Sequence, residues 1–203
     1  MRGRLRDRTR PVPGNHEYLD DARGYRAYYG AAATPDGRTY YSFDSGAWHF
    51  VALDSNLSMG PDSAQVRWLR DDLARNGRRC VAAYWHHPLF ISGDHGNNPV
   101  SRPAREALQA AGADLVLTGH DHDYERFAPQ RADGRGDAGG IAEFVVGTGG
   151  ASNRPLVAER PHSVVRMTNV HGVLKLTLND TAYIWEFVSV DGKVRDRGSA
   201  TCH

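Results

Sequence analysis

The chain has 203 residues, of which 40% are apolar and 24% are charged, and its formal net charge is +1. This length and composition are typical of one globular domain with a sizeable core. A balance so close to neutral gives no reason to expect a nucleic acid or an acidic membrane as partner, and no apolar run approaches the roughly 18 residues of a transmembrane helix.

The N-terminal residues 1–10 are basic and lead into Pro11-Val12-Pro13 rather than into an apolar segment. They therefore lack the apolar region of a secretory signal. Because a polar stretch runs directly into a dense motif, we expect the natural domain to begin upstream, and secretion would belong to that longer form. The location of the chain and its oligomeric state stay open.

The two cysteines are Cys80 and Cys202. Two buried thiols and one disulfide fit this count equally well. A bridge between them would favour an extracytoplasmic setting.

The pattern along the first part of the chain predicts strands alternating with helices. Tyrosines at i, i+3 and i+4 indicate a short helix or an aromatic turn over 24–30;. The remaining predictions for this part are a hairpin of 39–43 and 48–53, a helix capped by Asp62 with Gln65 as capping-box partner and ending at Asn76-Gly77, a strand over 79–85, a helix from Ser101 to Gly112, and a strand over 115–117;.

The last third reads differently. We expect a surface loop over 131–140, a strand over 141–146, a hairpin of 173–178 and 182–188, and a final short strand after Asp191-Gly192;. Strand–helix alternation followed by an antiparallel meander predicts a mixed α/β layered fold. With no internal repeat and no linker, residues 1–203 are predicted to form a single domain.

Three stretches carry histidines at positions where chemistry is expected. They are Gly14-Asn15-His16-Glu17, Trp85-His86-His87-Pro88 and Gly119-His120-Asp121-His122. Each follows an extended run, and in open α/β sheets sites form beyond the carboxyl ends of strands. Imidazoles with an Asn carbonyl suit mixed nitrogen–oxygen coordination of Zn, Fe or Mn. These stretches therefore predict a hydrolytic metal site.

The order and spacing of the three stretches resemble the calcineurin-like metallophosphoesterases. His86-His87-Pro88, a further His95 and Tyr124-Glu125-Arg126 are similar to the purple acid phosphatase-like branch. The resemblance implies a layered α/β/β/α sandwich and a dinuclear centre of Fe, Zn or Mn that hydrolyses phosphomonoesters. The implied partner is a phosphate-ester substrate.

The resemblance also implies a role for each matching residue. Asn15, His86 and His120 would ligate the second metal, and His122 would ligate the first. His16 would hydrogen-bond the phosphate, with Glu17 orienting it. His95 would bind phosphate or protonate the leaving group.

The chain departs from the family pattern at its start. The family has two aspartate-bearing motifs upstream of Gly-Asn-His, and the residues before Gly14 contain only Asp7, in a context that matches neither. We therefore expect a truncated catalytic domain that lacks N-terminal strands. The alternative function is a truncated, catalytically impaired fragment that binds at most one metal.

Other residues of these stretches have a plainer interpretation. His87 and Tyr124-Glu125-Arg126 are interpreted as structural support. Gly147-Thr148-Gly149-Gly150 lacks the lysine and the following helix of a phosphate loop, so it is interpreted as a tight turn.

Overall fold

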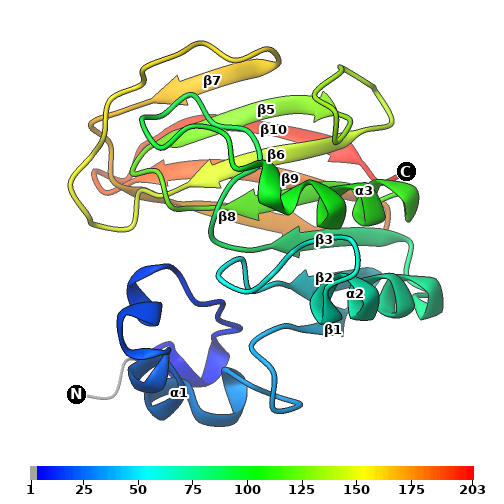
Figure 1. Ribbon diagram of the computed structural model, residues 1–203. Helices are drawn as coiled ribbons and strands as arrows, with labels where there is room; N and C mark the ends of the chain where they lie inside the picture. Colours follow the sequence, from blue (N-terminus) through cyan, green and yellow to red (C-terminus); the bar gives the residue numbers. More distant parts are fainter. Residues whose placement is uncertain (1–3) are drawn as a thin grey trace.

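In the computed structural model, which describes residues 4–203, a pair of helices, a seven-stranded sheet and a three-stranded sheet lie in successive layers (Figure 1). The larger sheet consists, in spatial order, of β1 (Tyr41–Ser45), β2 (Trp48–Ala52), β3 (Cys80–Tyr84), β4 (Leu115–Thr118), β6 (Ile141–Val146), β5 (Tyr124–Gln130) and β7 (Ser163–Met167). The smaller, antiparallel sheet consists of β10 (Val194–Thr201), β9 (Ala182–Ser189) and β8 (Gly172–Leu178).

The central strands β2, β3, β4 and β6 run parallel, while β1, β5 and β7 are antiparallel to their neighbours. The predicted mixed α/β layered fold is thus confirmed. The described residues form three layers of the expected sandwich, in the order α/β/β.

Helices α2 (Ala64–Arg75) and α3 (Arg102–Ala110) lie side by side on one face of the larger sheet (Figure 1). Val66, Leu69 and Leu73 share one face of α2, and all three are buried;. Each such aliphatic side chain contributes about 1.5–3 kcal/mol when fully buried. The strand residues beneath the helices include Val51, Val81, Ala83 and Val116.

The opposite face of the larger sheet packs on the smaller sheet through aromatic side chains. Tyr124 stacks on Phe187 with ring centroids 4.1 Å apart, and Phe144 meets Trp185 edge-on at 5.6 Å. A disulfide joins Cys80, the first residue of β3, to Cys202, which follows β10. Of the two states that the sequence left open, the structure has the bridge.

The segment before β1 contains no strand between residues 4 and 40. It forms the short helices η1 (Arg6–Arg8), η2 (His16–Asp20), α1 (Arg23–Tyr29) and η3 (Gly30–Ala32). The expectation that residues 11–13 form a strand end of the sheet is wrong. Pro11 and Pro13 have no backbone N–H, so this stretch could offer only one N–H to the hydrogen bonds of a sheet. The hydroxyls of Tyr25 and Tyr41 instead donate to the Pro11 carbonyl at 3.0 and 2.8 Å.

Most other predicted elements are confirmed within a few residues, and the differences concern the capping of α2 and two strands. The N-cap of α2 is Ser63 rather than Asp62, since Ser63 Oγ accepts the Val66 N–H at 3.2 Å. Gln65 is buried and bonds the backbone of Asp54, so it is not a capping-box partner. Strands β5 and β7 were not predicted. A further short helix, η4, spans Pro99–Ser101.

Among the described residues, no helix is long and apolar enough to cross a membrane.

His49 on β2 joins the larger sheet to α2 through two carboxylates. Its Nδ1 lies 2.8 Å from Asp44 Oδ1 and its Nε2 lies 2.9 Å from Asp72 Oδ2. Burial lowers the pKa of His49, but the hydrogen bonds to Asp72 and Asp44 outweigh it, and the net pKa is raised from 6.5. The imidazolium is therefore favoured in the folded chain.

This pair of bonds predicts a pH-dependent stability. A raised folded pKa means that the contribution of His49 is complete below its ordinary value of about 6.5 and is lost as the pH rises through the folded value. We expect His49→Gln to lower the free energy of unfolding by roughly 1–2 kcal/mol near pH 5.5 and by less near pH 8.5. Urea unfolding at both pH values measures this, and an equal loss at both would contradict it.

The disulfide spans 122 residues and should stabilise the chain mainly by restricting its unfolded state;. The chain-entropy relation gives an upper value of about 5 kcal/mol for a loop of this length. We expect the double variant Cys80→Ser/Cys202→Ser to lose several kcal/mol in urea unfolding. A reducing agent should destabilise the original chain and leave the double variant unchanged; no effect on the original chain would refute the bridge.

Candidate metal centre

The histidines of the second and third stretches are brought together by the pairing of β3 with β4. The two strands are parallel, with Tyr84 opposite Leu117. Two backbone bonds continue the pairing past the strand ends, from Trp85 N to the Leu117 carbonyl at 3.1 Å and from Gly119 N to the His86 carbonyl at 3.0 Å. Residues 86 and 120 therefore leave adjacent strands at the same edge of the sheet.

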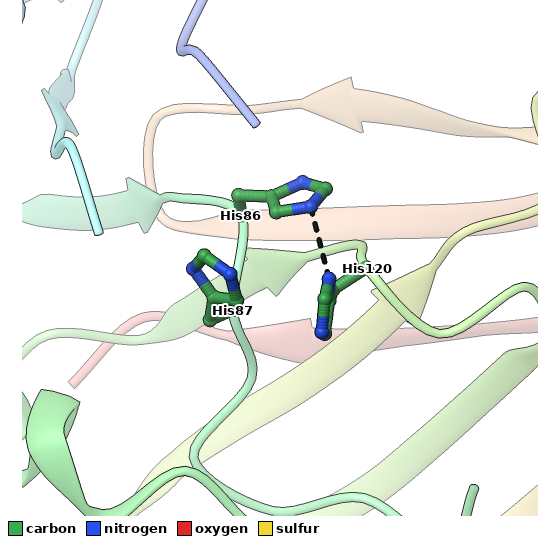
Figure 2. A group of neighbouring side chains, drawn as sticks. All are labelled: His86, His87 and His120. Atoms are coloured by element: carbon green, nitrogen blue, oxygen red, sulfur yellow. Dashed lines mark hydrogen bonds between the residues drawn. The ribbon is translucent and has the colours of Figure 1, made fainter. Parts of the chain in front are cut away.

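Three donor atoms converge at this edge. His86 Nε2 lies 2.8 Å from Asn15 Oδ1 and 3.1 Å from His120 Nδ1. Figure 2 shows the His86 and His120 rings facing each other through these two nitrogens, with His87 beside them. A metal bonded to nitrogen or oxygen at about 2.0–2.1 Å holds neighbouring ligand atoms about 3 Å apart. The donor set and its spacing fit one such ion.

The protonation of these histidines suits metal binding as well. Burial, together with the positive charges of neighbouring histidines, lowers the pKa of His86 to about 3 and that of His120 to about 4. Both rings are then neutral at pH 7, which is the form that ligates metals.

The backbone at the third stretch is held in an uncommon conformation. His120 has φ 69, in the left-handed region that non-glycine residues seldom occupy;. The chain at Gly147 packs directly against the next residue of this turn, since a Cβ there would lie 1.5 Å from the Asp121 carbonyl oxygen. Close backbone packing thus fixes the turn that presents His120.

His122 faces the same cavity but stands apart from the three converging donors. Its Nδ1 donates to the Ser152 carbonyl at 2.7 Å, which leaves the lone pair on Nε2;. The one group of metal-type side chains around His120 in residues 4–203 consists of His86, His87 and His120, with ligand atoms within 4.8 Å of one another. His87 is otherwise bonded through Nδ1 to Ser55 Oγ at 2.8 Å.

The cavity at this edge has a volume of about 340 Å³ and includes most of the predicted site residues. Asn15 and His16 reach it from the start of η2, and both are exposed. Glu17 does not line it; its Oε2 accepts the Gly14 N–H at 2.7 Å. The orientation of His16 by Glu17 therefore stays a prediction, while the bond that the structure gives Glu17 braces the loop.

His95 enters the cavity from the loop after β3 and is held by Asp121. His95 Nδ1 donates to Asp121 Oδ1 at 2.6 Å, and the Asp121 side chain is fully buried. Burial raises the pKa of Asp121, and the bond from His95 opposes that rise. Asp121, the middle residue of the His-x-His stretch, thus points away from the metal donors and supports His95.

Several residues of this site gave no recognisable signal in the sequence. Arg154 lines the cavity and donates to Asp94 Oδ2 at 3.0 Å. Gly149 and Gly150 form part of its wall, so the tight turn interpreted in the sequence belongs to the site. The glycine-rich run after β6 was the only available clue, since nothing in the spacing connects Arg154 with His95.

The triplet Tyr124-Glu125-Arg126 lies beneath the site on β5, and its predicted structural role is confirmed. Buried Glu125 accepts the Ser92 N–H at 2.8 Å and the Ser92 hydroxyl at 2.6 Å. Arg126 pairs with Asp196 Oδ2 at 2.7 Å, which ties the larger sheet to β10. Glu125 therefore anchors the loop that carries His95.

A sequence model of calcineurin-like phosphoesterases matches residues 2–124, more than half of the chain. The chain belongs to the calcineurin-like phosphoesterase family. Purple acid phosphatase 15 of Arabidopsis thaliana is 33% identical over 129 residues, which cover 57% of this chain and 24% of that relative. Acid phosphatase type 7 of Homo sapiens is 28% identical over 223 residues, covering 91% and 50%.

The solved structure of purple acid phosphatase PPD1 from yellow lupin (Lupinus luteus) shares the fold. It superposes with a TM-score of 0.76 over 86% of this chain and 36% of its own length, at 22% identity. The predicted resemblance to the purple acid phosphatase branch of the phosphoesterase family is thus confirmed. The chain spans 24% of the length of the first of these relatives and 50% of the second.

For this member of the calcineurin-like phosphoesterase family, the neighbouring donors predict stabilisation by metal. A ligand at 100 times its Kd stabilises the folded state by about 2.7 kcal/mol. We expect Zn²⁺ or Mn²⁺ to raise the melting temperature of the chain and to leave His120→Ala unchanged. His171→Ala, outside the cavity lining, is the control and should respond like the original chain; an equal rise in His120→Ala would contradict the site.

Proposed function

We propose that this chain carries the metal-binding and phosphate-binding face of a phosphomonoesterase that uses a dinuclear centre. The observation that supports it most is that Asn15 Oδ1 and His120 Nδ1 both lie within 3.1 Å of His86 Nε2 at the sheet edge. The relatives named purple acid phosphatase and acid phosphatase supply the reaction class. The proposed substrates are phosphate monoesters.

The residues divide into two sets. Asn15, His86 and His120 would hold one ion, and His122 would contribute Nε2 to a second. Such ions, when bound, polarise the phosphoryl oxygens and lower the pKa of water. Fe, Zn and Mn all suit imidazole and amide-oxygen donors.

The cavity walls carry the residues that would act on the substrate. His16 lies on η2 beside Asn15, while His95 lies across the cavity next to His120, with ring centroids of His95 and His120 4.1 Å apart. His16 would donate a hydrogen bond to a phosphoryl oxygen. His95, whose Nδ1 proton is held by Asp121, would use Nε2 to bind the phosphate or to pass a proton to the leaving oxygen;.

A second candidate is a chain that binds one ion and turns over substrate poorly. The group around His86 and His120 includes no carboxylate among residues 4–203, and His122 has a carbonyl as its bonded partner. Metal stoichiometry separates the candidates: two tightly bound ions per chain support the first, and one supports the second.

The activity itself predicts a clear variant pattern. With Fe, Zn or Mn added, we expect the chain to hydrolyse an aryl phosphate, and we expect His95→Ala to lower kcat about 10²–10⁴-fold because proton transfer or phosphate binding is lost. His120→Ala should abolish metal-dependent turnover. His171→Ala serves as the matched control, and equal rates for the original chain and His120→Ala would sink the proposal.

A further inference from the structure

One turn outside the cavity lining contacts both the loop that carries Asn15 and the loop that carries His86. This turn, Asp54-Ser55-Asn56, begins two residues after the end of β2, and β2 is the parallel neighbour of β3. The Leu53 N–H donates to the Tyr84 carbonyl at 2.9 Å, so the turn emerges beside His86. None of its residues lines the cavity.

Towards the first loop, the turn acts through the side chain of Asn56. Its Nδ2 donates to the carbonyls of Pro13 at 3.2 Å and Gly14 at 3.3 Å. These carbonyls lack a sheet neighbour, since residues 4–40 form no strand. Asn56 therefore takes the place that a paired strand would fill, directly before the Asn15 ligand.

Towards the second loop, the turn acts through Ser55. The His87 N–H donates to Ser55 Oγ at 3.0 Å, and His87 Nδ1 lies 2.8 Å from the same oxygen. His87 adjoins the ligand His86, so the backbone on both sides of the Asn15–His86 donor pair is held by one turn. This gives His87 a structural role through its neighbour.

Asp54 is buried, and its hydrogen bonds to several elements hold the turn in place. Asp54 is fully buried, and its Oδ1 accepts Asn56 N at 3.0 Å and Asn56 Nδ2 at 3.1 Å. Its Oδ2 accepts the Tyr18 hydroxyl at 2.5 Å, which ties η2 to the turn. Gln65 of α2 bonds both backbone groups of Asp54, at 2.7 and 3.0 Å.

The loop that carries Asn15 packs closely against the His86 side chain. A Cβ on Gly14 would lie 2.9 Å from His86 Cε1, so the first loop already touches the His86 ring. A shift of residues 13–14 would then change the 2.8 Å separation of Asn15 Oδ1 from His86 Nε2. Fixing the Pro13 and Gly14 carbonyls fixes that separation.

We propose that Asn56 is a positioning residue of the metal centre: the turn Asp54-Ser55-Asn56 holds the Asn15 and His86 donors at ligand spacing and so sets the affinity for metal. This inference rests on the metal site of the proposed function. Groups that orient ligands in this way typically change metal affinity about 10-fold to 100-fold when they are removed.

The test is a Co²⁺ titration of the full chain, followed by visible absorption, which reports both affinity and coordination. We expect Asn56→Ala to weaken the Kd about 10-fold to 100-fold and to change the Co²⁺ spectrum as the Asn15 oxygen is displaced. Asn76→Ala is the matched control, because Asn76 also bonds local backbone, at Arg78, and the bonds shown for its side chain reach neither donor loop. It should bind Co²⁺ like the original chain.

Two further variants keep the outcomes separate. If Asn56→Ala fails to fold, Tyr18→Phe removes only the hydroxyl bond to Asp54 and should still weaken Co²⁺ binding. If a folded Asn56→Ala binds Co²⁺ with the original affinity and spectrum, the inference is overturned while the metal site stands. If Asn56→Ala does not fold, the same result with Tyr18→Phe overturns it. If the original chain and His120→Ala bind Co²⁺ equally, the metal site itself fails, and the role of Asn56 fails with it.

Discussion

The parallel pairing of β3 with β4 is the interaction on which the rest of the site depends. Its hydrogen bonds continue past both strands, so His86 and His120 start from backbone atoms that are already bonded to each other's strands. The paired backbone alone brings the two histidine rings close enough for their nitrogens to lie 3.1 Å apart. Parallel strands buried on both faces supply that rigidity, with helices on one side and the aromatic face of the smaller sheet on the other;.

Much of this arrangement could be predicted from the sequence because the signals were local. The sequence indicated α2 by the helical spacing of Val66, Leu69 and Leu73, and it indicated β3 by the apolar run at residues 80–84. His86 follows that strand within two residues. Strand ends in one sheet meet at one edge, so the convergence of the stretches with His86 and His120 followed from order alone. Asn15 does not follow a strand, and its loop is held instead by hydrogen bonds from the Asn56 side chain.

The parts that the sequence did not predict depend on contacts between distant residues. Asp123, directly before β5, and Glu125 on β5 are both buried acids, which contradicts the apolar pattern of an inward strand face. The Asp121–His95 bond spans 26 residues, and the Ser152–His122 bond spans 30. Asp62 and Ser63 are both good caps, and only the backbone conformation decides between them. Such choices are settled by tertiary packing rather than by local preference.

The bridge from Cys80 to Cys202 has a consequence for how the chain is made. Cys80 begins the same strand that ends before His86, so one strand carries the covalent link at its base and a metal donor beyond its tip. During synthesis the central strands emerge long before β10, and the link cannot close until residue 202 has been added. The final anchoring of the strand that presents His86 is therefore a late event in synthesis.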